Sequence, residues 1–435
     1  MTPVWRWPLY SFKQLHALET PLGSRDLYNS VSYCNRCGSC MQACPIYQLT
    51  HQEAFSPRGR NQLLRLILEQ KLKPAPTDPV LLDVITSCTL CGRCTQACAG
   101  QIPTAEHVLE MRRAFSLRVL PGFLQSFLQL RTTHSRIFAL CARSALLLRR
   151  MGFVSCLRTL RVTRLSALRG LIHINEILPA RITSLKKTLS RAGQPLTQDN
   201  PELIYLPSLE AEFILPDIAL RTLQRARQKY RTVVWKNMPT GLFDYVYGDL
   251  RLSRRTLRRL ITKHAHYANG NLPLVTDSID VYLFLKRAPQ LFAAYDNWQT
   301  KARRFAACVR FVTDLPNTTP PVNKKENAGP VLLDKSALFE RQGGPFEQAQ
   351  KNLYTFFGKN LVECFYTDAD VPAFGYVFVD PKKATQIGLK AVEKVARTQT
   401  RLVVVLSGLA ALELTYLLKK FYPSAKATHF VHVDR

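Results

Sequence analysis

The first clear pattern of apolar and polar positions in the chain predicts a helix from Arg58 to Lys71. Ser56-Pro57 precedes it, and a serine cap followed by a proline at the first helical position is typical of a helix start. The segment Lys73-Pro74-Ala75-Pro76 ends the pattern, because proline cannot continue a helix. One face, which we expect to be buried, carries apolar residues at the helical period: Leu63, Leu64, Ile67 and Leu68.

Two shorter helices are predicted at Leu81–Thr86 and Thr104–Phe115. Residues 1–33 contain many aromatic side chains without any period, so we expect an irregular arm that packs over the neighbouring structure.

Residues 120–190 predict several basic helices, with breaks at Pro121-Gly122, Met151-Gly152 and Gly170. Leucine and arginine alternate in blocks at the helical period, which is typical of an amphipathic helix. Two interpretations stay open: a solvated charged face over a core, or a surface that docks on an acidic partner or a membrane. The clearest block contains Leu157, Arg158, Leu160, Arg161, Arg164, Leu165, Leu168 and Arg169.

From about residue 203 onward, short apolar runs alternate with helical patterns, which indicates an α/β fold. A loop rich in proline, asparagine and lysine, Leu315–Pro330, divides this part into two halves of similar order and suggests an internal repeat. The predicted helices are Ile218–Arg231, Ser253–His264 and Lys382–Arg397. The predicted strands are Leu203–Leu206, Thr232–Trp235, Leu272–Thr276, Ala306–Val312, Val331–Leu333, Gly375–Val379 and Leu402–Leu406.

Two copies of one cysteine motif, Cys-x-x-Cys-x-x-Cys-x-x-x-Cys, lie between residues 34 and 98. This is the spacing of bacterial ferredoxins with two [4Fe-4S] clusters, in which the fourth cysteine of each motif ligates the other cluster. We therefore expect two crossed ligand sets: Cys34, Cys37, Cys40 and Cys98 on the first cluster, and Cys88, Cys91, Cys94 and Cys44 on the second.

The spacing has a physical reason, since three cysteines at two-residue intervals let a tight loop wrap one cluster. Gly38 and Gly92 lie inside the two loops, where the missing Cβ would permit a close approach to the cluster. Structural zinc fits less well because it uses paired Cys-x-x-Cys knuckles with four ligands per ion. Disulfides would need an oxidising compartment.

The length of 435 residues leaves room for two or three domains. Met1–Tyr10 has no apolar run with a small-residue cleavage site, which argues against secretion. The best apolar stretches, Ile137–Leu148 and Leu402–Leu418, each contain a charged residue and are shorter than the roughly 20 residues of a membrane span. We expect a cytoplasmic protein that can attach peripherally at the inner face of the membrane.

The formal net charge of +29 is the unusual feature of the composition. Residues 111–200 alone hold sixteen lysines and arginines against two acidic residues, Glu176 and Asp199. Such an imbalance implies an acidic partner surface, whether protein, anionic lipid or nucleic acid. Nucleic acid is the least favoured of these, because the stretch is rich in leucine and not interleaved with aromatic residues or glycines.

The first 115 residues resemble the iron-sulfur subunit of glycolate oxidase and its relatives in lactate-utilisation and anaerobic glycerol-3-phosphate dehydrogenase complexes. The resemblance rests on CNRCGSCMQACPIYQL, on the SPRGR that follows it, and on CTLCGRCTQACAGQIPT. It implies an α+β multidomain protein: a helical dicluster [4Fe-4S] ferredoxin domain at 1–115, a basic helical connector at 116–200, and two α/β repeats at 201–315 and 330–435.

In that family the repeats carry Cys-Cys-Gly motifs and further cysteines that form another redox site, and here they are missing. The corresponding segments read Met238-Pro239-Thr240-Gly241, Asp334-Lys335-Ser336-Ala337 and Ser407-Gly408-Leu409-Ala410. We therefore interpret the α/β part as a degenerate copy without a metal site. The remaining cysteines are expected to be small buried hydrophobes, and the histidine pairs to be surface or core residues: Cys141, Cys156, Cys308 and Cys364, and His264 with His266 and His429 with His432.

The resemblance implies an electron-transfer subunit of an oxidoreductase complex and not its catalytic subunit. A flavin-dependent (FAD) dehydrogenase subunit would oxidise a 2-hydroxy acid such as glycolate or lactate, and two [4Fe-4S] clusters would carry the electrons to a quinone or another acceptor. The alternative is a non-redox iron-sulfur adaptor whose basic helices bind nucleic acid or an acidic protein.

Overall fold

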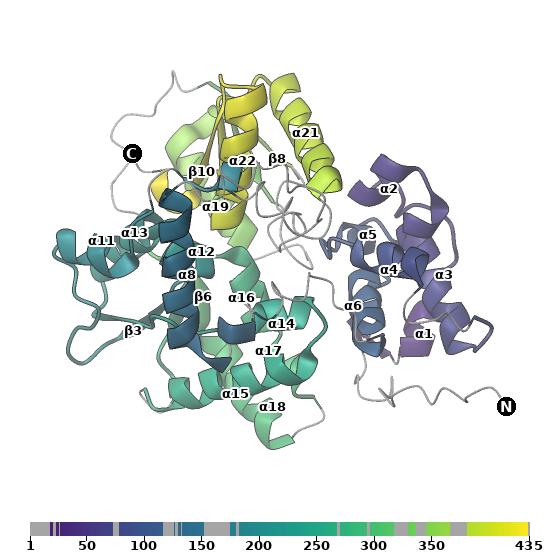
Figure 1. Cartoon of the computed structure of the whole chain (residues 1–435), viewed down its shortest axis with the longest axis horizontal. Coiled ribbons are helices and arrows are strands. Elements are labelled where there is room, and N and C mark those ends of the chain that lie inside the picture. The colour runs from purple at the N-terminus through teal and green to yellow at the C-terminus, as the bar shows by residue number, and fades with distance from the viewer. Residues whose placement is uncertain are drawn as a thin grey trace.

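The computed structural model combines helices with two small parallel sheets (Figure 1). Within its described part, every helix is too short or too polar to cross a bilayer. The structure describes residues 18–20, 23–25, 27–72, 78–115, 126, 129–131, 133–151, 175–179, 182–267, 270–293, 296–316, 329–335, 345–365 and 381–433.

The cysteine-rich part is helical and lies at the right of Figure 1. The predicted helix at Arg58 is α3, Pro57–Leu68, and the Ser56 side chain accepts a hydrogen bond from the Gly59 N–H at 2.8 Å, as expected of its cap. The elements are β1 (Leu18–Thr20), β2 (Gly23–Arg25), α1 (Leu27–Ser32), α2 (Pro45–Thr50), η2 (Glu53–Phe55), α3, α4 (Pro79–Thr86), α5 (Arg93–Gln96) and α6 (Thr104–Ala114).

The expectation of an irregular arm over residues 1–33 is wrong for its described part. β1 and β2 pair as an antiparallel hairpin, and α1 follows directly. The reason is packing, because Leu27 and Val31 on α1 are buried in the core of the cysteine-rich part.

The basic stretch is described only in part. Its described helices are α8, Ser135–Arg150, and α11, Leu185–Arg191. Phe138 of α8 is buried and meets Phe213 edge to face, with ring centroids 5.5 Å apart. The leucine and arginine block at 157–169 lies outside the described residues.

The first α/β unit contains a four-stranded parallel sheet in the order β4-β3-β5-β6. Its strands are β3 (Leu203–Leu206), β4 (Thr232–Val234), β5 (Leu274–Thr276) and β6 (Val309–Phe311). Its helices are α12 (Leu209–Phe213), α13 (Pro216–Arg227), α14 (Leu242–Val246), α15 (Leu250–Ala265), α16 (Ile279–Lys286), α17 (Ala288–Leu291), α18 (Asp296–Cys308) and η4 (Val312–Asp314).

The second unit contains another four-stranded parallel sheet, in the order β10-β9-β7-β8. Its strands are β7 (Val331–Asp334), β8 (Leu361–Phe365), β9 (Leu402–Val405) and β10 (Lys426–His429). Its helices are α19 (Pro345–Phe357), η5 (Gly358–Asn360), α21 (Pro381–Arg397), α22 (Gly408–Phe421) and η7 (Phe430–His432).

The two sheets share one topology. Counted along the chain within each unit, the strands of both sheets stand in the order second, first, third, fourth. This is the beginning of the doubly wound arrangement, in which the carboxyl ends of the first and third strands flank a crevice. The shared order supports the internal repeat that the sequence suggested.

Two of the predicted strands differ from the described structure or lie outside it, and two observed strands were not predicted. The strand expected at Ala306–Val312 is shorter, because α18 continues to Cys308 before β6 begins. Gly375–Val379 lies outside the described residues. The sequence analysis missed β8 and β10, since β10 reads Lys-Ala-Thr-His and lacks the apolar run of a buried strand.

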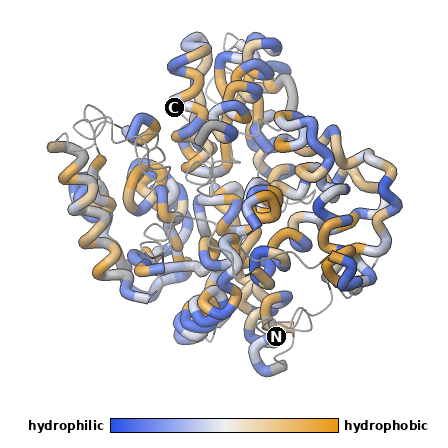
Figure 2. Tube along the Cα trace, turned by 45° about the vertical axis from the view of Figure 1, so that its right-hand side comes forward, coloured by the Kyte–Doolittle hydropathy of each residue, from blue (hydrophilic) through white to orange (hydrophobic). Residues whose placement is uncertain are grey.

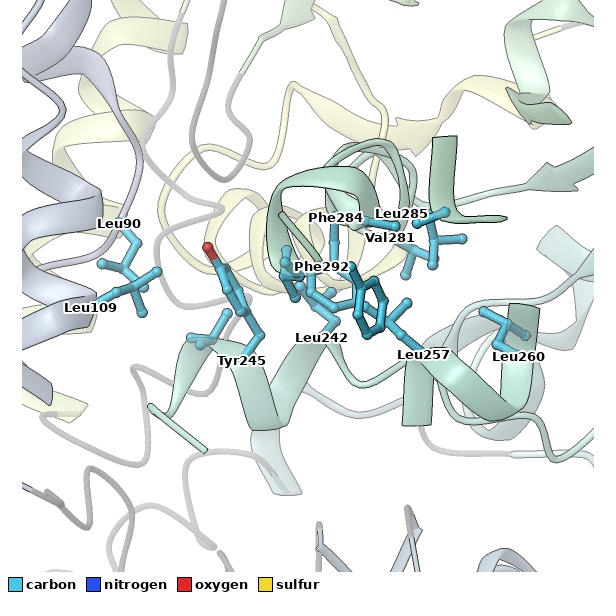
Figure 3. Packing of buried hydrophobic residues seen from close by; sticks show 14 of the residues in the cluster. Leu90, Leu109, Leu242, Tyr245, Leu257, Leu260, Val281, Phe284, Leu285 and Phe292 are labelled. Atoms are coloured by element: carbon cyan, nitrogen blue, oxygen red, sulfur yellow. The ribbon is translucent and has the colours of Figure 1, made fainter. Parts of the chain in front are cut away.

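The hydrophobic cores cross the boundaries between these parts. Leu90 and Leu109 of the cysteine-rich part belong to the same buried cluster as Leu242, Tyr245 and other residues of the first unit (Figure 3). A second cluster joins residues of both sheets. Along the outer helices, polar and apolar residues alternate around the chain, as amphipathic packing requires (Figure 2).

Asp277 links the two α/β units at the carboxyl end of β5. The Tyr205 hydroxyl donates to its carboxylate, and the Ser208 N–H donates to the same group at 3.0 Å. From the second unit, the His429 Nε2 lies 3.0 Å from the Asp277 carbonyl oxygen. Burial raises the pKa of the Asp277 carboxyl, because a buried carboxylate is energetically costly. The hydrogen bonds from Tyr205 and Ser208 offset part of this cost.

Candidate metal centre

The two cysteine loops share two backbone hydrogen bonds at matching positions, although only the second contains a helical turn, α5. In the first loop the Met41 N–H donates to the Gly38 carbonyl at 2.9 Å, and the Thr95 N–H does the same to Gly92 in the second, also at 2.9 Å. In both loops the next bond runs from the N–H of the fourth cysteine to the carbonyl of the residue three places before it. The duplicated sequence therefore gives a similar, though not identical, backbone in the two loops.

The glycines inside the loops are required by the backbone itself. Gly38 has φ +89° and Gly92 has φ +77°, in the left-handed region that favours glycine. The residues two places before them, Arg36 and Leu90, also have positive φ, at 56° and 57°. Each loop thus turns sharply at matching positions, which brings its first three cysteines to one side.

Two neighbouring cavities gather the cysteines. The first is about 240 Å³ in volume and the second about 20 Å³. Thiols from both motifs line each of them, so the fourth cysteine of each motif reaches across to the other loop. The first is lined by Cys34, Cys37, Cys40 and Cys98, and also by Cys94; the second by Cys44, Cys88, Cys91 and Cys94.

The electrostatic neighbours of the thiols divide in the same way. Burial, followed by the charges of Cys34, Cys98 and Cys37, raises the pKa of Cys40 to about 11. Burial also raises the pKa of Cys94, followed by the charges of Cys91, Cys88 and Cys44 and, last, of Cys40 from the other set. A set of thiolates this crowded needs positive charge at its centre, which a bound iron-sulfur cluster supplies.

The donor chemistry of both sets, four cysteine thiols each, fits a [4Fe-4S] cluster. The first cavity has room for a group much larger than a water molecule, which needs about 10–15 Å³, whereas the second is packed more tightly. Within the described residues, no three or more His, Cys, Asp and Glu side chains stand close enough to hold a single metal ion.

The two sets differ in exposure. Cys37 is exposed, and the Ser39 hydroxyl lies 3.3 Å from its sulfur and lowers the pKa of the thiol. Cys44 is 7% exposed and packs in a small apolar cluster with Ile46, Phe55 and residues of α21, including Ile387. The two sets therefore differ at one member each, Cys37 open to solvent and Cys44 packed against α21, while the other six thiols are partly buried.

A buried polar chain, missed by the sequence analysis, lies beside the cysteines. The His107 ring contacts the Ser30 hydroxyl at 2.9 Å and the Asn61 side-chain oxygen at 2.8 Å. Asn61 in turn donates to Thr104 at 3.0 Å, and Thr104 lines both cavities. Burial lowers the pKa of His107 to about 4, so the ring is neutral at physiological pH.

Two buried arginines, Arg112 and Arg60, form hydrogen bonds with the cysteine loops and with the first α/β unit. Arg112 donates to the Cys88 carbonyl at 2.7 Å, to Thr86 at 3.1 Å and to the Val246 carbonyl of the first α/β unit at 3.0 Å. Arg60 of α3 contacts the Cys44 sulfur at 3.9 Å. Sequence patterns could have indicated Arg60, because it lies one turn before Leu64 on the apolar face of α3.

The three segments that lack the expected cysteines follow strands of the parallel sheets. Thr240 and Gly241 precede α14, Asp334 ends β7, and Ser407 precedes α22. The side chains of Thr240, Asp334 and Ser407 are buried. No thiol occurs in the described residues of these segments.

The remaining cysteines and histidines are only partly as expected. Cys141 and Cys308 are half-buried and not fully buried, because they lie at helix surfaces. Cys156 and the side chain of Cys364 lie outside the described part. His264 and His429 are buried core residues, His264 bonded to the Leu272 carbonyl at 2.7 Å, whereas His266 is exposed.

Comparison with known proteins matches residues 30–102 to the 4Fe-4S dicluster domain family. Lactate utilization protein B of Macrococcus caseolyticus is 25% identical over 138 residues, 27% of this chain and 25% of that protein. Its counterpart from Exiguobacterium sp. is 28% identical over 96 residues, 20% of this chain and 18% of that protein. The "Probable glycolate oxidase iron-sulfur subunit" of Bacillus subtilis is 26% identical over 101 residues, 23% of this chain and 22% of that protein.

The chain thus matches a quarter or less of the length of these relatives. No solved structure matches it. Residues 30–102 contain all eight motif cysteines. Residues 30–102 thus match a 4Fe-4S dicluster domain, and the chain is similar, at low identity, to proteins named lactate utilization protein B and to a probable glycolate oxidase iron-sulfur subunit.

Proposed function

We propose that this chain is the iron-sulfur electron-transfer subunit of a flavin-dependent 2-hydroxy acid dehydrogenase complex. Its two [4Fe-4S] clusters would pass electrons one at a time from an FAD-containing subunit to a quinone or another acceptor. The ligand sets are Cys34, Cys37, Cys40 and Cys98 for the first cluster, and Cys88, Cys91, Cys94 and Cys44 for the second.

The observation that carries this proposal is that the eight motif thiols line two neighbouring cavities, and that the first three cysteines of one motif meet the fourth cysteine of the other at each cavity. This arrangement supports two crossed ligand groups, as in two-cluster ferredoxins. Because Cys94 lines both cavities, the groups lie close enough to form one continuous route. The bound clusters each accept and release one electron, while the protein contributes their spacing, burial and surrounding charge.

The difference in exposure between Cys37 and Cys44 suggests where a redox partner approaches the two clusters. The first set opens to solvent at Cys37, beside Arg36 and the half-exposed Arg58, so a partner could approach it there. The names of the relatives support the choice of a 2-hydroxy acid as the substrate of the complex. We further propose functional units at 1–115, 116–200, 201–315 and 330–435, of which the second docks on the partner or on the cytoplasmic membrane face.

Anaerobic analysis of iron and acid-labile sulfide tests the cofactor directly. Two complete ligand sets predict about eight irons per chain. About four irons, or stoichiometric zinc, would contradict the proposal. Affinity purification from the native host under low salt should also recover a flavoprotein; recovery of nucleic acid in its place, released by salt, would favour the adaptor function.

A further inference from the structure

Arg60 is a cation buried next to one of the two ligand sets. Its side chain is 1% exposed and lies on α3 between the cysteine loops. The guanidinium donates from Nε to the Val84 carbonyl at 2.9 Å and from Nη2 to the Ser87 hydroxyl at 2.9 Å. From Nη1 it reaches the Cys44 sulfur at 3.9 Å. The forked donors thus hold the charge at a fixed place beside that sulfur.

A buried positive charge is costly without nearby negative charge. The Cys44 sulfur is one such partner, because it lies 3.9 Å from the Arg60 Nη1 and would carry negative charge as a cluster ligand. Ser87 directly precedes Cys88, so Arg60 also contacts the loop that supplies three further thiols. Arg60 therefore serves the second set, and its contacts with Ser87 and Cys44 span both motifs.

Arg58, two residues earlier, provides a natural contrast. It lines the first cavity, but its side chain is 31% exposed and its Nε lies 2.7 Å from the Glu53 carboxylate. Its Nη1 also donates to the Arg36 carbonyl at 3.0 Å. Since solvent and Glu53 offset this charge, it acts weakly on the first set.

We propose that Arg60 raises the reduction potential of the cluster held by Cys44, Cys88, Cys91 and Cys94, and leaves that of the other cluster nearly unchanged. This rests on the proposed function. Uptake of one electron adds one negative charge to a cluster, and a fixed cation with a donor aimed at a ligand sulfur stabilises that added charge. In a dry site the effect is large because water does not screen it.

Burial of the second set acts in the opposite direction, because a low dielectric disfavours the more highly charged reduced form. Arg60 offsets this penalty. A neutral residue at this position would leave the second cluster harder to reduce than the first. Electron transfer from the first cluster to the second would then be slower. Arg60 is thus a positioning and tuning residue, since it ligates no metal.

The test uses the full chain with its clusters, as the wild type and as Arg60→Gln, Arg60→Lys and Arg58→Gln. Anaerobic redox titration followed by electron paramagnetic resonance gives the two one-electron potentials of each protein. In Arg60→Gln we expect one potential to fall by at least 59 mV, a tenfold change in its equilibrium constant. Arg58→Gln should shift both potentials by much less.

Arg60→Lys keeps the charge but lacks the fork of donors, so the same potential should fall by a smaller amount. If Arg60→Gln does not retain both clusters, Arg60→Met takes its place, since it also removes the charge, and an unchanged pair of potentials would overturn the inference. Equal shifts of both potentials in Arg60→Gln would also overturn it, because Arg60 would then act through the general fold. Wild type with fewer than two reducible clusters would instead refute the proposed function.

Discussion

Glu413 is a carboxyl group buried inside the second α/β unit. It lies on α22, its side chain is 4% exposed, and its Oε1 has no hydrogen-bond partner in the part of the chain that the structure describes. Burial raises the pKa of this carboxyl to about 8. We predict that Glu413→Gln, which keeps the shape and removes the ionisation, stabilises the protein at alkaline pH.

The sign and size follow from the pKa. Between about pH 4.5 and 8 the folded protein keeps a proton that the unfolded chain has released, so its stability is complete below about 4.5 and falls as pH rises through about 8. At about 1.4 kcal/mol per pKa unit, the full loss is at most about 5 kcal/mol. From pH 6 to pH 9, the gain in unfolding free energy from Glu413→Gln should grow by about 3 kcal/mol.

Anaerobic guanidinium unfolding, followed by far-ultraviolet circular dichroism at several pH values, measures this gain against wild type. Effects of pH on the clusters are common to both proteins and cancel in the difference. Glu393→Gln is the matched control, because Glu393 is exposed on the neighbouring α21 and its removal should give no pH-dependent gain. A gain for Glu413→Gln that stays flat across this range would refute the reasoning.

Three further predictions concern the site and its partners. Cys44→Ser should chiefly alter the resonance spectrum of the second cluster and Cys98→Ser that of the first; damage confined to each residue's own motif would rule out the crossed ligation. Arg112→Met should lower the unfolding free energy by about 3–5 kcal/mol, because the carbonyl groups of Val246, Thr86 and Cys88 lose the donor of this buried side chain. Arg255→Met, at an exposed helix position, should change it by less than about 0.5 kcal/mol. Binding to vesicles of anionic lipid or to the flavoprotein should weaken from 0.1 M to 1 M salt, as the Debye length falls from about 10 to about 3 Å; binding that does not respond to salt would show that the basic stretch is only a solvated face.

Local signals predicted the parts of the fold that local forces decide. The Ser56 cap and the apolar face of α3 are encoded within one helix, and the position of the helix is as expected. The alternation of strands and helices likewise predicted an α/β part in two halves, because the central strands of both sheets are buried on both faces and read as apolar runs.

The features that sequence could not supply depend on distant contacts. The hydrogen bond between His107 and Asn61 joins residues 46 positions apart, and the one between Arg112 and Val246 joins residues 134 positions apart. No short sequence pattern predicts either contact. Pairing of β10 with β9 overrides a polar sequence that has no strand signal of its own. The same holds for the end of α18, where neighbouring β5 fixes the first residue of β6.

The core that passes from the cysteine loops into the first α/β unit has a consequence for how the protein can be divided. Cutting the chain after Phe115 would bare Leu90, Leu109 and Met111, which now pack with that unit. An isolated ferredoxin fragment would expose this hydrophobic surface to solvent, and we expect it to aggregate. A recombination that separated the two cysteine loops from this unit would expose the same apolar side chains.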